Sequence, residues 1–74
     1  MMRLERVART IAGALNDAVD EAMADADDLL RMHGATEFER LSYLEAYRVE
    51  LAAWRTKTFA ALFARFQRDG QTLQ

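Results

Sequence analysis

The segment RMHGATEFE, residues 31–39, constrains the fold more than any other part of the sequence. Gly34 is typical of the position just beyond a helix C-terminus, because glycine readily adopts the left-handed conformation needed there. Thr36 is a good N-cap, and Glu39 three residues later completes a capping box, so a second helix should begin at once. A link of about three residues joins helices that pack as antiparallel neighbours. The sequence therefore predicts a tight helix–helix turn at Gly34.

Apolar residues recur at helical spacing on both sides of this turn, and the chain contains no proline. Spacings of i, i+3, i+4 and i+7 place these side chains on one face of each helix. We predict helices at about 2–33 and 36–69, each roughly 45 to 50 Å long at 1.5 Å per residue, and a frayed tail at 70–74. A chain of 74 residues forms one domain. The predicted fold is all-α: residues 1–74 form a single long antiparallel αα-hairpin.

The apolar surface of the second helix is wider than one neighbouring helix can cover. One set of side chains is centred near Leu41 and Phe59, a second set beside it includes Trp54, and together they span more than half of the helix. A single antiparallel neighbour covers a stripe of roughly 100°. The chain also lacks cysteine, so no disulfide supports its small core. We therefore expect association, as a homodimeric four-helix bundle or with another protein, through Tyr43, Tyr47, Trp54, Phe59 and Phe63.

Two arginines, Arg48 and Arg55, lie one heptad apart within the apolar sector of the second helix. In the predicted hairpin, Arg48 faces Glu21 with Asp25 one turn away, and Arg55 lies near Asn16. We expect each arginine to pair across the hairpin or to extend its head group into solvent. The alternative is an anion site between the helices, which makes the chain a small-molecule-binding protein or a small helical enzyme.

Charge is distributed unequally along the predicted hairpin. The turn end, residues 17–45, contains nine acidic and two basic side chains, whereas the open end, residues 1–16 and 46–74, contains eight basic and three acidic ones. The net charges are therefore −7 and +5, and in the first helix they oppose the macrodipole. Two hairpins paired head to tail would match these charges. The acids that we expect to steer association are Asp20, Asp25, Asp27 and Asp28, of which Asp20, Asp27 and Asp28 are predicted to face outward.

The sequence offers little for catalysis or metal binding. Asp25 and Asp27 diverge by about 200° on a helix and lack the spacing of a calcium-binding loop. His33 is not preceded at the third position by the glutamate that di-iron helical bundles use, and Ser42 lies about nine residues from it on the other helix. We predict no metal, no cofactor and no enzymatic activity.

The open end carries a modest group of arginines that could contact nucleic acid: Arg3, Arg6, Arg9, Arg65 and Arg68. A dimeric αα-hairpin of this length is similar in size and topology to Rop, a plasmid regulator that binds RNA. The resemblance implies a dimeric nucleic-acid-binding regulator as an alternative function. Alternatively, the acidic turn end could imitate a phosphate backbone and occupy a basic groove on a nucleic-acid-handling protein.

No secretory signal is visible, because charged residues interrupt the first ten positions. The longest apolar run, residues 59–64, is far shorter than the roughly 20 residues of a membrane span. We expect a cytoplasmic protein with no membrane contact. The function expected first is a non-enzymatic interaction module: a small adaptor, assembly subunit or inhibitor that binds a larger protein.

Overall fold

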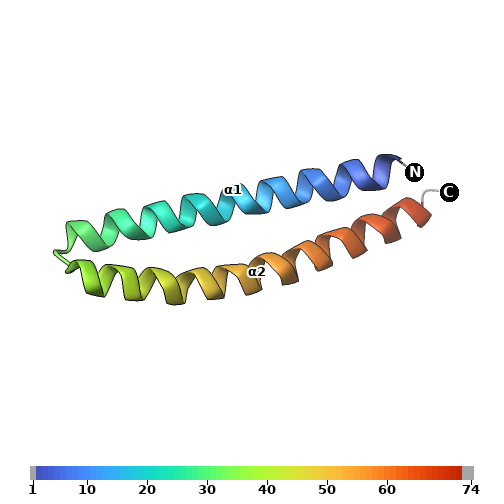
Figure 1. Ribbon diagram of the computed structural model, residues 1–74. Helices are drawn as coiled ribbons and strands as arrows, with labels where there is room; N and C mark the ends of the chain where they lie inside the picture. The colour runs from blue at the N-terminus through green and yellow to red at the C-terminus, as the bar shows by residue number, and fades with distance from the viewer. Residues whose placement is uncertain (1, 73–74) are drawn as a thin grey trace.

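The protein is an all-helical hairpin, as predicted (Figure 1). The computed structural model describes the backbone of residues 2–72 and the side chains of residues 4–68. Helix α1 spans Met2–Met32 and helix α2 spans Glu37–Thr72. The two helices lie side by side and antiparallel, so the start of α1 and the end of α2 lie at the end of the rod opposite the turn.

The turn has the two signals that the sequence predicts. Gly34 has a φ angle of +76°, and the amides of Gly34 and Ala35 donate to the carbonyl oxygens of Arg31 and Leu30 at 3.1 and 3.0 Å. This pair of bonds is a Schellman motif, which satisfies the last carbonyl groups of α1. A side chain at position 34 would be strained by the backbone conformation, although the space beside the Cα is open.

The capping box at the start of α2 is confirmed. The Thr36 amide donates to Oε1 of Glu39 at 2.9 Å, and the Glu39 amide donates to Oγ1 of Thr36 at 3.1 Å. Hydrogen bonding from Thr36, first from its backbone N–H and second from its side chain, stabilises the charged Glu39 carboxyl and lowers its pKa below the usual 4.5. The turn is therefore specified by chemistry within a few residues of itself.

The helix bounds differ slightly from those predicted. Helix α1 ends one residue before the predicted end at 33, and α2 begins one residue after its N-cap. Helix α2 continues to Thr72, three residues beyond the predicted end, and so includes most of the segment predicted to fray. Residues 73–74 of that segment lie outside the described residues.

The hairpin is a thin rod of 56 × 15 × 15 Å, and its core is correspondingly small. Among the side chains described, Leu15 is the only apolar one that is buried, with 8% of its surface exposed. Two helices can shield only the stripe along which they touch, which leaves the flanks of the rod open to solvent. Among residues 4–68, nine large apolar side chains remain exposed: Leu4, Leu29, Met32, Phe38, Leu41, Tyr43, Val49, Trp54 and Leu62.

Candidate interaction surface

One side of the hairpin carries three of the aromatic residues predicted to form an interface. Tyr43, Tyr47 and Trp54 are separated by four and seven residues, so they follow one another along the same side of α2. The rings of Tyr43 and Tyr47 lie 5.9 Å apart in a tilted arrangement. Tyr43 is 53% exposed and Trp54 is 43% exposed. We call this side of the rod, together with the neighbouring surface of α1, the aromatic flank.

A groove opens on the aromatic flank near the turn. Its volume is about 450 Å³, and it lies between the C-terminal half of α1 and the first turns of α2. Its walls combine apolar surface with one carboxylate and one imidazole: Ala22, Asp25, Ala26, Leu29, Leu30, His33, Tyr43 and Tyr47. An apolar groove with a few polar groups at its edge suits the side chains of a docking helix.

The groove also identifies which residues of α1 belong to the aromatic flank. Leu29 lines it, and Ala22, Ala18, Ile11 and Leu4 precede Leu29 by 7, 11, 18 and 25 residues, which are close to whole numbers of helical turns. These residues therefore continue the same side of α1 from the turn to the open end. The aromatic flank therefore carries apolar side chains along most of the rod.

The other two predicted interface residues lie elsewhere. Phe59 and Phe63 stack on each other with ring centroids 5.7 Å apart and an interplanar angle of 8°. Phe63 follows Trp54 by nine residues, or two and a half turns, which places it on the opposite side of α2. Phe59 lines a smaller hollow of about 220 Å³ on that side, together with Ala12, Leu15, Asn16, Arg55 and Thr56. We call this side the phenylalanine flank. The five residues predicted to form one interface therefore lie on two different surfaces.

Arg55 lies where the sequence places it. Its Nη1 donates to Oδ1 of Asn16 at 2.8 Å, which joins α2 to α1 near the middle of the rod. Arg48 is exposed and does not line the hollow that contains Arg55. The small-molecule anion site around these two arginines stays a prediction.

The predicted pairing of Arg48 with Glu21 or Asp25 is wrong. Within the described part of the chain, Arg48 makes no ion pair. Glu21 lies six residues beyond the buried Leu15, so its side chain leaves α1 about 120° away from the direction of the core, on the aromatic flank. Arg48 precedes Arg55 by seven residues and so lies on the phenylalanine flank. The two residues are at the same height along the rod but on different sides.

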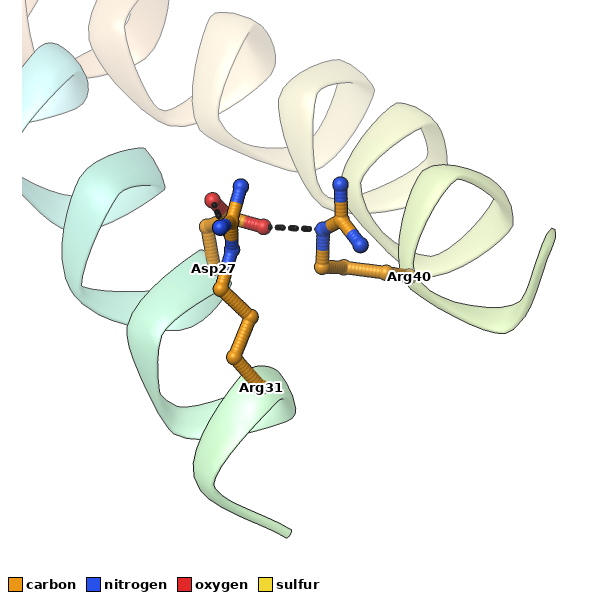
Figure 2. A network of polar contacts seen from close by, with 3 residues as sticks. All are labelled: Asp27, Arg31 and Arg40. Carbon is orange, nitrogen blue, oxygen red and sulfur yellow. Dashed lines mark hydrogen bonds and ion pairs between the residues drawn. The ribbon is translucent and has the colours of Figure 1, made fainter. Parts of the chain in front are cut away.

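The ion pair that does join the helices involves Asp27, which the sequence analysis placed at the outer surface. That expectation is wrong. Asp27 Oδ1 lies 2.6 Å from Nε of Arg40 on α2, and its Oδ2 lies 3.1 Å from Nε of Arg31, one turn later on α1 (Figure 2). The Asp27 side chain is 26% exposed and that of Arg40 is 20% exposed.

Contact between Asp27 and Arg40 is electrostatic rather than a well-aligned hydrogen bond. Oδ1 of Asp27 and Nε of Arg40 are both buried, and neither atom has a hydrogen-bonding partner. The bond from Nε of Arg31 to Oδ2 does have hydrogen-bond geometry. Arg40 could have been found from the sequence, because the hairpin register places it opposite residue 29, close to the acidic segment of α1.

The other three acids expected to steer association make no ion pair among the residues that the structure describes. Asp20 and Asp28 are exposed. Asp25 is exposed at the edge of the groove, and it makes no ion pair with any residue that the structure describes. A carboxylate beside two tyrosines and two leucines is therefore available to a cation from outside the chain.

The basic residues of the open end do not form one face. Arg6 precedes Leu15 by nine residues, so it points away from α2, and Arg65 follows Trp54 by eleven residues on the aromatic flank. Arg9, three residues from Arg6, also turns away from the core, and Arg68 lies one turn beyond Arg65. The side chain of Arg3 lies outside the described residues.

The described residues also bear on metal binding and on membrane insertion. They contain no group of three or more histidine, aspartate or glutamate side chains placed to hold a metal ion. Neither helix, over its described length, has a stretch apolar and long enough to cross a bilayer. No protein-family model, curated protein or solved structure matches the chain.

Proposed function

We propose that this chain is a non-enzymatic protein–protein interaction module: a small adaptor, assembly subunit or inhibitor that acts by binding a larger protein. The observation that carries the proposal is the imbalance between buried and exposed apolar surface. One apolar side chain of the described residues is buried, whereas nine large ones are exposed. Monomeric proteins rarely expose apolar patches of more than a few hundred Å², and larger patches mark interaction sites.

The composition of the exposed surface supports the same conclusion. Tyrosine and tryptophan are enriched among the residues that dominate binding energy, and they act best when a partner removes them from water. Tyr43 and Trp54 are about half exposed in the free hairpin, and Tyr43 lines a groove. Acids at the edge of that groove, such as Asp25, would favour a partner with a basic surface and would increase its association rate.

Site-specific photo-crosslinking in the native cells tests this proposal. We expect a photoreactive phenylalanine analogue at one or more of positions 43, 54, 59 and 63, which sample both flanks, to give a discrete adduct much heavier than two copies of the chain. The matched control is position 42. Ser42 is exposed, and its side chain leaves α2 about 100° away from that of Tyr43. Adducts no heavier than two chains at 43, 54, 59 and 63 would refute binding to a larger protein.

A further inference from the structure

We propose that the aromatic flank is covered by a second copy of this chain, packed face to face and antiparallel, with Trp54 beside the two-fold axis. This inference rests on the proposed function, since it names what occupies one of the surfaces on which that function depends. It leaves the phenylalanine flank, with Phe59 and Phe63, for the larger protein.

The area of the flank suits a stable dimer. A specific interface buries roughly 800 Å² on each partner. One side of a rod 56 Å long and 15 Å wide has a projected area of about 840 Å². The apolar side chains from Leu4 to Leu29 on α1, and from Tyr43 to Ala61 on α2, extend along most of this length. A second hairpin would therefore cover the flank from end to end and complete a four-helix bundle.

Charge determines the relative direction of the two copies. A parallel pair would bring the two turn ends together, each with a net charge of −7, and the two open ends together, each with +5. An antiparallel pair brings each turn end against an open end. Like charges facing each other across an interface cost free energy, whereas complementary ones favour encounter and set orientation. The antiparallel arrangement is thus strongly preferred.

The register within the hairpin places Trp54 at the centre. The bond from Arg55 to Asn16 sets position 54 opposite position 17, and these positions are within one residue of the midpoints of α2 and α1. Ala18, on the same flank, is exposed. A two-fold axis that crosses the flank at its middle therefore brings Trp54 against Trp54, and Ala18 against Ala18, of the second copy.

The same symmetry fills the groove at the turn end. Tyr43 lies eleven residues from Trp54, about 16 Å towards the turn, and Arg65 lies eleven residues in the other direction. Arg65 of the second copy therefore reaches the ring of Tyr43 and the unpaired carboxylate of Asp25. A guanidinium over a tyrosine ring beside a carboxylate combines cation–π and ionic attraction. Tyr47 faces Ala61 of the second copy, so a large side chain meets a small one.

Disulfide trapping tests this arrangement directly, because the chain has no cysteine of its own. A disulfide needs Cα atoms about 4.4 to 6.8 Å apart. In the proposed dimer, the cysteines of the two copies of Ala18→Cys form a disulfide with each other. Ala14 and Ala22 lie about one helical turn before and after Ala18. The two copies of Ala14→Cys, or of Ala22→Cys, therefore lie about 12 Å apart and do not link, whereas a mixture of the two variants forms the mixed disulfide. Ala24→Cys, on the outer side of α1, is the control and stays unlinked.

These alanine variants disturb the surface little, and sedimentation of the purified wild-type chain gives a second readout. We expect the wild-type chain to sediment with twice the chain mass. We also expect the mixture of Ala14→Cys and Ala22→Cys to form the mixed disulfide. A wild-type monomer at micromolar concentration would overturn the inference, as would self-linkage of Ala22→Cys, because it would show that the two-fold axis does not lie at the middle of the flank. A dimer in which Ala18→Cys stays reduced would overturn it too, because another flank would then be paired. None of these results decides the crosslinking test for a larger partner, so the two proposals fail separately.

Discussion

The contact between Asp27 and Arg40 is the ion pair that joins the two helices within the described residues, and its contribution to stability can be isolated. We predict that a double-mutant cycle with Asp27→Asn and Arg40→Gln gives a coupling free energy of about 1 kcal/mol. Fully exposed pairs give about 0.2 to 1 kcal/mol, and breaking a fully buried pair costs about 3 to 5 kcal/mol. Side chains that are 26% and 20% exposed lie between these limits.

Two features keep the predicted value near the lower limit. The 2.6 Å contact lacks hydrogen-bond alignment, because Oδ1 of Asp27 and Nε of Arg40 are without hydrogen-bonding partners. Asp27 also keeps its second oxygen bonded to Arg31, so the carboxylate is not left uncompensated when Arg40 is replaced. Asp27→Asn by itself would underestimate the contribution of the ion pair to stability. Removing a negative charge near the C-terminus of α1 relieves its repulsion with the helix dipole, which raises the free energy of unfolding by some tenths of a kcal/mol. The cycle cancels this local term.

Thermal unfolding followed by circular dichroism at a single fixed protein concentration measures the effect. An unfolding entropy of about 2.1 cal/mol/K per residue gives roughly 155 cal/mol/K for 74 residues, so 1 kcal/mol corresponds to about 6 °C in Tm. Arg31→Gln serves as the matched control. Its i,i+4 pair with Asp27 is 61% exposed on the arginine side and should contribute only about 0.3 to 0.5 kcal/mol, most of which is lost in high salt. A coupling below about 0.3 kcal/mol between Asp27 and Arg40 would refute the reasoning.

Three further predictions follow from the same structure. Thr36→Ala should cost about 1 kcal/mol, or roughly 6 °C in Tm, because the Glu39 amide loses its acceptor; an unchanged Tm would count against the cap. The pKa of Glu39 is lower in the folded state than in the unfolded state. The charged Glu39 carboxylate therefore stabilises the fold above pH 4.5, and this effect is lost as the pH falls through the lower folded-state pKa. The Tm of Glu39→Gln should accordingly vary less with pH in that acidic range than the Tm of wild type. Because Arg6 and Arg65 point to different sides of the rod, we expect no mobility shift of RNA or DNA at low salt; a shift abolished by Arg6→Ala would instead favour the nucleic-acid-binding alternative.

The sequence was sufficient for the fold because the decisive signals are local. Gly34 and the Thr36–Glu39 capping box define the turn within six residues, and each acts on backbone groups one turn away. A short link between two amphipathic helices leaves only an antiparallel hairpin. Register along the rod followed too, as the Asn16–Arg55 contact confirms. The end of α2 was less predictable, because its C-terminal turns contain no strong stop signal before Thr72.

The side of the rod to which each polar residue points was harder to predict. Register gives the height of a residue, whereas pairing also requires both side chains to lie on the same flank. Glu21 and Asp27 leave α1 at equal angles from the core direction of Leu15, but on opposite sides. Arg40 reaches the side of Asp27, and no arginine of α2 reaches Glu21 among the described residues. A helical wheel for one helix does not show which side of the rod an arginine on the other helix reaches.

The same distinction explains the acids near the C-terminus of α1, where the macrodipole disfavours them by some tenths of a kcal/mol each. Asp27 is compensated inside the chain, since two arginines surround it. Asp25 is not: it remains exposed beside Tyr43 and Tyr47, and no described residue neutralises it. A carboxylate that opposes its own helix and lacks an intrachain partner stabilises nothing in the free hairpin. Its placement acquires a physical reason once a cation from another molecule enters the groove, and in the antiparallel dimer that cation is Arg65.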